Sequence, residues 1–247
     1  MKQSLTWGAL AVCAYVVFLL IKLPATQVLG HMTLPPEIKL QGIRGTIWQG
    51  QASTATLHGM PVNNIRWSLD FWPLLLGKVS ATLSAGNIRE PDDIAFNGEL
   101  SLNSQRVQMH NVQAYLPTNL MMTLLPLPFP VKAQGRFKVQ ISELDYQQSC
   151  QTLNGDGQWL NASVAGLNGM IDLGNFSAAM ACENNAVVLR VSEPNRFGMT
   201  AQATIAADFT FSVNGRFKPD AALPEEVHQA AQFFGQQDAQ GYYTLKF

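Results

Sequence analysis

The sequence predicts a mostly β protein that follows a single N-terminal transmembrane helix. Residues 5–21 form an apolar run without charges, and beyond it apolar and polar residues alternate in many short segments. The composition agrees, because 47% of the residues are hydrophobic and only 13% are charged, about half the charged share of an ordinary soluble domain. This composition excludes a disordered chain, and a net charge of −1 provides no basic surface for nucleic acid.

The apolar run has the length of a membrane span. It lies between Lys2 and Lys22, and a helix of this length can just cross a bilayer if its flanking lysines reach the headgroups. We therefore expect a cytoplasmic tail at residues 1–4, a transmembrane helix at residues 5–21 and an extracytoplasmic β-rich domain at residues 22–247. The expected anchor residues are Leu5, Trp7, Tyr15, Phe18 and Ile21. A cleaved signal peptide is the alternative, but no small-x-small cleavage site follows the run.

Alternation of period two predicts about twelve short antiparallel strands in the rest of the chain. The clearest candidates are residues 65–69, 79–83, 100–102, 107–109, 137–141, 187–191 and 209–213. Turn-forming residues separate them, with residues 103 and 104 joining two of the candidates. The Asn-Gly steps at residues 97, 168 and 214 and the glycine-rich residues 154–157 predict further hairpin turns.

Two short helices interrupt the predicted strands. Residues 118–125 lie between Pro117 and Pro126, and residues 224–234 begin with Pro224 and end before Gly235. The tetrapeptide Gly-Arg-Phe-Lys occurs at residues 135–138 and again at residues 215–218. This weak internal repeat is compatible with two related sub-sheets, but it does not divide the domain.

Cys150 and Cys182 are the two cysteines outside the apolar run. In an oxidising compartment two such cysteines most often form a disulfide, and we expect one here. The alternative is a pair of separately buried thiols.

Catalytic and metal-binding motifs are missing from the sequence. The four histidines follow no ligand spacing, and neither a nucleophile elbow nor a phosphate-binding glycine loop is present. We therefore expect no enzyme, no cofactor and no metal site. Trp48, Trp67, Trp72 and Trp159 are interpreted as core residues of the sheet, because they lie in or beside strand-like segments.

A series of short motifs resembles the type II secretion system protein N family of the Gram-negative inner membrane. Residues 42–50 read G-I-R-G-T-I-W-Q-G, and they are followed by Trp67 and by the W-P-L-L-L-G stretch at residues 72–77. Paired cysteines and the Gly-Arg-Phe-Lys segment near Pro219 continue the similarity. The motif residues are Gly42, Gly45, Thr46, Trp48, Gly50, Trp67, Trp72, Leu75 and Gly77. Gly45 and Gly50 are expected to permit bends around a strand whose inward-pointing residues are Ile47 or Trp48.

The resemblance implies a non-enzymatic, single-pass inner-membrane protein with a cytoplasmic N-terminus and a periplasmic domain at residues 22–247. Such a protein would be an accessory component of the type II secretion system, supporting export of folded periplasmic proteins through contacts with other components. The alternative function is a membrane-anchored β-groove that binds or transfers lipid. Segments such as residues 79–83 and 187–191 would line that groove.

Overall fold

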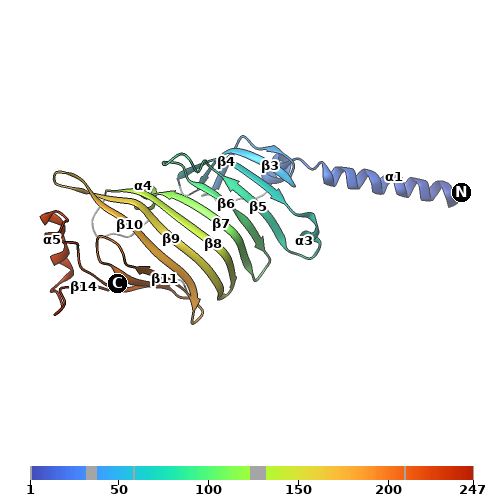
Figure 1. Ribbon diagram of the computed structural model, residues 1–247. Helices are drawn as coiled ribbons and strands as arrows, with labels where there is room; N and C mark the ends of the chain where they lie inside the picture. Colours follow the sequence, from blue (N-terminus) through green and yellow to red (C-terminus); the bar gives the residue numbers. More distant parts are fainter. Residues whose placement is uncertain (1, 32–37, 58, 123–131, 209, 247) are drawn as a thin grey trace.

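The computed structural model describes residues 2–31, 38–57, 59–122, 132–208 and 210–246 of the chain. These residues form one antiparallel sheet and a long N-terminal helix that projects away from it (Figure 1). The predicted mostly β, antiparallel architecture is therefore confirmed.

Fourteen strands are present in the described part of the chain, and all of them belong to the same sheet. In chain order they are β1 (Ile38–Gln41), β2 (Arg44–Gly45), β3 (Gln49–Leu57), β4 (Met60–Leu69), β5 (Val79–Ala85), β6 (Ala95–Leu102), β7 (Val107–Pro117), β8 (Ala133–Gln147), β9 (Ser149–Gly166), β10 (Gly169–Glu183), β11 (Ala186–Ser192), β12 (Thr200–Ile205), β13 (Phe211–Phe217) and β14 (Tyr243–Lys246). The two Gly-Arg-Phe-Lys copies overlap β8 and β13 of this one sheet.

From β3 onward each strand pairs with the next strand in sequence, so the sheet is a meander of hairpins. The predicted hairpin at residues 100–109 is confirmed, because Leu100 pairs with Met109 and Leu102 with Val107. The β10–β11 connection is the two-residue turn Asn184-Asn185, and both residues have the positive φ that a tight hairpin turn needs.

The prediction of uniformly short strands is wrong, since β8, β9 and β10 are 15, 18 and 15 residues long. The cause is bulging, which interrupts the alternation of apolar residues inside a continuous strand. Asn111 in β7 and Asn161 in β9 have positive φ, and the ladders beside them shift register. Asparagine tolerates this conformation better than other non-glycine residues do.

Several predicted turns are also wrong. Of the three Asn-Gly steps only the one at Asn168 is at a hairpin turn, where Gly169 begins β10, whereas Gly98 lies inside β6 and Gly215 inside β13. Residues 154–157 lie within β9. Their glycines serve close packing instead: a Cβ on Gly98 would come within 2.7 Å of Val112 Cγ2, and one on Gly155 within 2.7 Å of the Gln140 carbonyl oxygen.

Both predicted short helices are present in the described residues, together with two that the sequence did not indicate. Helix α4 (Thr118–Met122) covers the described part of the first, since residues 123–125 lie outside the described residues. Helix α5 (Glu225–Ala231) continues as the 3-10 turn η1 (Gln232–Phe234) and ends at Gly235, which has positive φ. The additional helices are α2 (Ala25–His31) and α3 (Phe71–Leu75).

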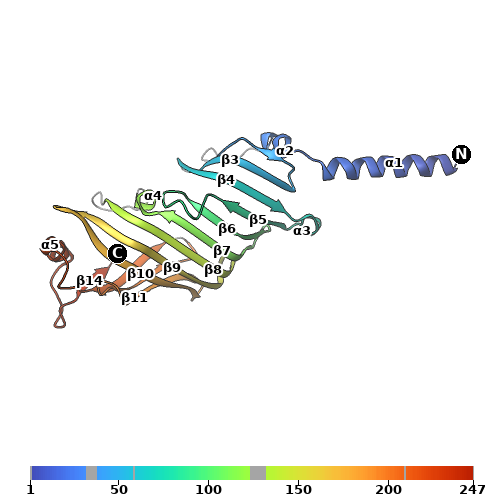
Figure 2. The same cartoon turned by 45° about the horizontal axis from the view of Figure 1, so that its top comes forward.

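Helix α1 (Lys2–Ile21) leaves the sheet at the end opposite α5 (Figures 1 and 2). Its apolar side chains from Leu10 to Ile21 are exposed. No helix in the described residues combines the length and the apolarity required to cross a bilayer. The span at residues 5–21 therefore stays a prediction.

The best-packed core lies at the C-terminal end of the sheet, where α5 covers it. Val227 of α5 is buried in a cluster with Ile171 and Leu173 of β10. Ala231 is buried next to Phe217 and Tyr243, which pair between β13 and β14. The amphipathic helix predicted at this position therefore supplies the apolar cover of the last strands.

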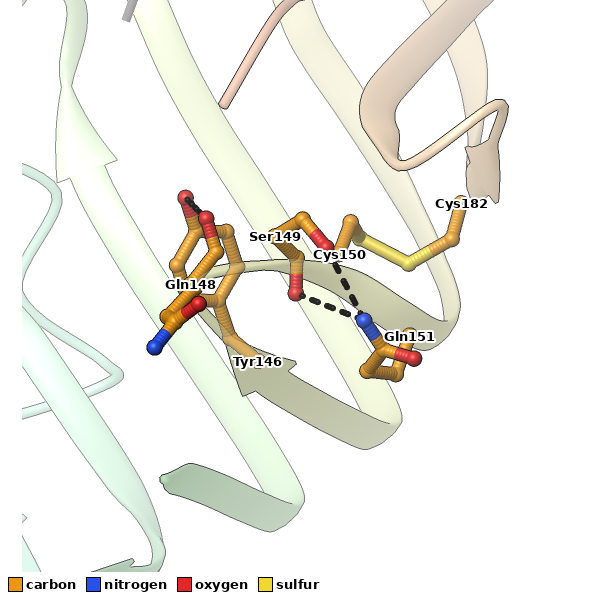
Figure 3. Close-up of a disulfide and its surroundings, with 6 residues drawn as sticks. All are labelled: Tyr146, Gln148, Ser149, Cys150, Gln151 and Cys182. Atoms are coloured by element: carbon orange, nitrogen blue, oxygen red, sulfur yellow. Dashed lines mark hydrogen bonds between the residues drawn. A yellow bond between two sulfur atoms is a disulfide. The ribbon is translucent and has the colours of Figure 1, made fainter. Parts of the chain in front are cut away.

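Cys150 and Cys182 form the predicted disulfide, with 5.5 Å between their Cα atoms (Figure 3). Cys150 is the second residue of β9, just after the β8–β9 turn, and Cys182 lies near the end of β10, just before the β10–β11 turn. The Cys150 amide also donates to the carbonyl oxygen of Asn185, at 3.2 Å. The disulfide thus joins the ends of two hairpins, β8–β9 and β10–β11, whose turns lie at the same end of the strands.

A second cross-link is the ion pair between Arg106 and Asp145. Arg106, in the β6–β7 turn, donates two hydrogen bonds to the Asp145 carboxylate of β8, at 2.8 and 2.6 Å. These bonds hold the pKa of Asp145 below its ordinary value, against the opposing effect of desolvation. The carboxylate is largely covered, with 12% of its side chain exposed, whereas the arginine is 41% exposed.

Removing the disulfide should destabilise the fold by about 3–4 kcal/mol, because it closes a loop whose ends are 32 residues apart and so restricts the unfolded chain. Denaturant unfolding of Cys150→Ser, followed by circular dichroism, measures this loss. Cys13→Ser removes the free cysteine of α1 and is the control. Equal midpoints for the two variants would contradict the prediction.

Asp145→Asn should lower stability at neutral pH and change its pH dependence. A folded-state pKa below the unfolded value gives stabilisation that is complete above the unfolded pKa of about 3.9 and is lost as the pH falls through the folded pKa. The difference between wild type and variant, measured by urea unfolding across the acidic range, should therefore shrink below pH about 4. A difference that stays constant would show that the ion pair contributes no pH-dependent stability.

Candidate functional site

The family-like motif forms the junction between α1 and the sheet. At its centre residues 46–49 make a tight turn, in which the Thr46 amide donates to the Gln49 carbonyl oxygen at 2.9 Å. The Gln49 amide donates to the Thr46 hydroxyl at 3.1 Å, which explains a threonine at this position. Gly45 has φ +90 and makes the bend into the turn. The expected bend at Gly45 is confirmed, but Ile47 and Trp48 belong to a turn and not to a strand.

Two indole groups fasten this turn to its neighbours. Trp48 Nε1 donates to the carbonyl oxygen of Leu20 in the last turn of α1, at 2.7 Å. Trp67 Nε1, from β4, donates to the Ile47 carbonyl oxygen at 3.1 Å. The chain after α1 is held as well, because the Ile47 amide donates to the Leu23 carbonyl oxygen at 3.0 Å. The junction therefore couples the direction of α1 to the first strands.

Gly50 is needed for close approach and does not bend the chain as expected. A Cβ at this position would overlap the ring of Trp67, and it would lie 2.9 Å from the Thr46 carbonyl oxygen. Gly42 has φ +67 and is likewise crowded, there by the Ser53 side chain. The motif glycines thus let the Trp67 ring and β3 lie against the turn.

The remaining motif residues lie beside the junction, in the β4–β5 connection that contains α3. Trp72 is 76% exposed and Leu75 65% exposed, so the interpretation of Trp72 as a core residue is wrong. Gly77 has positive φ and ends the α3 turn, where its amide donates to the Leu74 carbonyl oxygen. Phe71 connects α3 to the turn at residues 46–49, because its ring meets that of Trp48 edge-on with centroids 5.3 Å apart.

The other candidate surface is one continuous face of the sheet. Residues directly opposite each other on neighbouring strands point to the same side, so the register identifies each face. One row crosses ten strands, β5 to β14, and contains only apolar residues and glycine. Its members are Ala85, Phe96, Ala114, Val139, Gly157, Ala178, Val191, Ala201, Gly215 and Leu245. We call the side of the sheet that carries this row the apolar face.

The adjacent row points to the opposite side and is polar apart from Ala179. It runs through Arg66, Ser84, Asn97, Gln113, Gln140, Asp156, Ala179, Arg190, Gln202, Asn214 and Lys246, and we call its side the polar face. All ten residues of the apolar row are only half-buried. In the described structure, a second layer of side chains therefore does not close this part of the apolar face.

The apolar face lies inside a curve at its C-terminal end. Strands β11–β14 curl behind β9 and β10 in both views (Figures 1 and 2). A stack of rings follows the same curve, from Phe137 through Trp159 to Phe176, with centroids 5.4 and 5.6 Å apart. Phe197 then lies 6.2 Å from Phe176 of β10 and 6.0 Å from Phe217 of β13. Phe197 thus links rings on two strands that are separated by β11 and β12 in the sheet order, which fits the curl of the sheet toward this side (Figure 1).

A hollow of about 640 Å³ opens on β7–β10 around Gly155. Val112, Ile141 and Met180 of the apolar face line it together with polar neighbours such as Gln140 and Asp156. Among the described residues no three His, Cys, Asp or Glu side chains are grouped as a metal site would require.

Sequence reasoning identified parts of the apolar face but missed its extent. Residues 79–83 and 187–191, proposed as groove-lining strands, do contribute Val79, Leu83, Val187, Leu189 and Val191 to it. These segments join into one surface only if the hairpins pair in the right register. Bulges at residues such as Asn111 shift that register.

Gly50→Ala should destabilise the protein by about 1–3 kcal/mol, because the new methyl group must displace the Trp67 ring or the turn. The matched control is Gly30→Ala in α2, where nothing lies within 4 Å of the added Cβ. Denaturant unfolding monitored by circular dichroism compares the two. A Gly50→Ala protein as stable as the control would show that the contact is not restrictive.

Comparison with known proteins gives a match along nearly the whole chain. The family model described as type II secretion system (T2SS), protein N, matches residues 36–246. The type II secretion system protein N of Aeromonas hydrophila is 27% identical over 259 aligned residues, which cover 100% of this chain and 98% of the relative. Those of Vibrio cholerae and Klebsiella pneumoniae are 26% and 24% identical, covering 99% and 98% of this chain and 98% and 94% of the relatives. No solved structure matches. With a family match that includes the turn at residues 45–50, the tryptophan of β4 and the whole of the sheet, the chain belongs to the type II secretion system protein N family.

Proposed function

We propose that the protein is a non-enzymatic accessory component of the type II secretion system, attached to the inner membrane by α1 with its sheet in the periplasm. Family membership over residues 36–246 carries this proposal. The exposed apolar side chains of α1 support membrane attachment. The short tail before the span carries Lys2 and the α-amino group, which favours a cytoplasmic N-terminus. The disulfide fits an oxidising compartment such as the periplasm.

Strand β14, at the edge of the sheet, is the proposed contact site for other secretion components. Within the described part of the chain, β14 is the last strand in the sheet order and pairs with β13 alone. The backbone groups on its other side could therefore pair with an added strand. A strand from another secretion component could extend the sheet there by backbone hydrogen bonding. This mode of contact requires no binding pocket.

Photo-crosslinking in cells tests the edge contact. A photoreactive amino acid replaces Thr244 in β14, and the control replaces Gln202, which lies inside the sheet on the polar face. We expect adducts with a type II secretion component at position 244 and few at position 202. If no type II secretion component is crosslinked at position 244, the edge contact is overturned. If no such component is crosslinked at any position of the sheet, the accessory role is overturned as well.

A second candidate function is the binding of lipid acyl chains along the apolar face. The observation that favours it is the uninterrupted, half-buried apolar row from β5 to β14, because an acyl chain needs an apolar lining without charged groups. The sheet curls with its apolar face on the inner side, so it could enclose an acyl chain more closely than a flat sheet would. Lipid binding and protein contacts at the edge use different parts of the sheet and are compatible.

Neighbouring residues of β8 provide a sharp test of lipid binding. Val139 lies on the apolar face and Gln140 on the polar face, and both are half-buried. Photoreactive amino acids at these two positions should give lipid adducts, identified by peptide mass spectrometry, at position 139 only. Gly157→Leu should reduce those adducts, since it adds bulk to the face where the nearest atom to a new Cβ is 4.0 Å away. Equal adducts at 139 and 140, or none at 139, would contradict lipid binding on this face.

A further inference from the structure

A cluster of exposed apolar side chains lies at the tip of the β4–β5 connection, near the place where α1 meets the sheet. Phe71, Trp72, Leu75 and Leu76, which we call the α3 tip, are 44%, 76%, 65% and 86% exposed. No charged residue occurs between Asp70 and Lys78. Four large apolar side chains gathered on one short turn form the kind of patch that marks an interaction surface.

The α3 tip is held in place by the residues at its base. The Asp70 amide donates to the Ser80 carbonyl oxygen at 2.8 Å, and the Ser80 hydroxyl donates to the Asp70 carboxylate at 2.9 Å. Within the tip the amides of Leu76 and Lys78 both donate to the Pro73 carbonyl oxygen, at 3.0 Å. These bonds fix the turn in a shape that presents its apolar side chains outward.

A chain of aromatic contacts joins the α3 tip to the end of α1. Trp48 donates to the Leu20 carbonyl oxygen, the Phe71 ring lies against Trp48, and the Trp72 ring meets Phe71 edge-on with centroids 5.6 Å apart. In both views α3 lies on the side of the sheet from which α1 departs, whereas α5 lies on the opposite side (Figures 1 and 2). The C-terminal end of α1 and the α3 tip are thus parts of one end of the molecule.

We infer that the α3 tip inserts into the interfacial layer of the lipid bilayer that α1 enters. This inference rests on the proposed membrane attachment of α1. Tryptophan is enriched at the membrane interface because its ring is apolar and its indole N–H is polar, and the leucines beside it supply the apolar area. Lys78 follows the tip and donates to the neutral side chain of Gln108, at 3.1 Å, so a positive charge lies where anionic headgroups would meet it.

Two attachment points at one end would set the orientation of the sheet. A single helix leaves a domain free to tilt, whereas the helix and a second point beside it restrict that tilt. The start of the apolar face, at Trp67 and Leu83, would then lie close to the membrane, because Trp67 is bonded to the same turn that holds α1.

Fluorescence quenching in vesicles tests the inference with the full chain. In a Cys13→Ser background, Leu76→Cys carries an environment-sensitive fluorophore, and the protein is reconstituted into vesicles of phosphatidylethanolamine and phosphatidylglycerol. Leu167→Cys is the matched control, because Leu167 is 88% exposed and belongs to the β9–β10 turn, which hydrogen-bonds to α5 at the opposite end. Phe18→Cys, on α1, reports whether the helix itself is in the membrane.

We expect lipids spin-labelled near the headgroup to quench the fluorophore at positions 18 and 76 and to leave position 167 unquenched. Quenching at 18 but not at 76 would overturn the inference and leave the membrane attachment of α1 intact. An unquenched position 18 would overturn that attachment and the inference with it. Equal quenching at 76 and 167 would indicate adsorption of the whole sheet, and it too would overturn the inference.

A protein partner is the competing occupant, and a photoreactive amino acid at position 76 in cells distinguishes it. Lipid adducts at position 76, absent at position 167, are the expected result. A discrete protein adduct without lipid at position 76 would overturn the inference by assigning the α3 tip to a protein interface.

Discussion

The structure depends on keeping apolar side chains on one face of the sheet across many hairpins. A strand changes face with every residue, so a shift of one residue would move a row such as Val139, Ala178 and Val191 to the other side. Bulges at Asn111 and Asn161 add single residues where the local alternation would otherwise fail. The long strands can therefore follow the curve of the sheet without exchanging their apolar and polar faces.

The same constraint explains where cross-links and helices are found. The disulfide joins two hairpin ends, and the Arg106–Asp145 pair joins a third to β8, so the ends of the central strands are held in register. Helix α5 covers the apolar face only at its C-terminal end, around Ile171 and Phe217. Among the described residues, the apolar row from β5 to β14 is half-buried, and β14 is the last strand of the sheet order.

At the end of the sheet opposite α5, the residues of the family motif connect helix α1 to the first strands. Thr46 closes a turn, Trp48 binds the last turn of α1, and Trp67 binds the turn to β4 through the space that Gly50 leaves. None of these contacts performs chemistry. They fix how helix α1 meets the first strands of the sheet.

The sequence by itself determined the class of the protein, because that information is local. Period-two alternation indicated an antiparallel sheet, Pro224 and Gly235 delimited a helix, and the ordered motif from Gly42 to Gly77 indicated the family. The two cysteines outside the apolar run, in a domain that the sequence predicts to be extracytoplasmic, were enough to predict the disulfide. Tertiary structure decided strand length, turn position and exposure. Asn97-Gly98 and Asn214-Gly215 resemble hairpin turns, yet pairing with neighbours on both sides holds them inside strands. Trp67 and Trp72 both lie in or beside strand-like sequence, but Trp67 packs against the turn at residues 46–49, whereas Trp72 is exposed. The apolar face exists only through the register of successive hairpins, which residues far apart in the sequence set together.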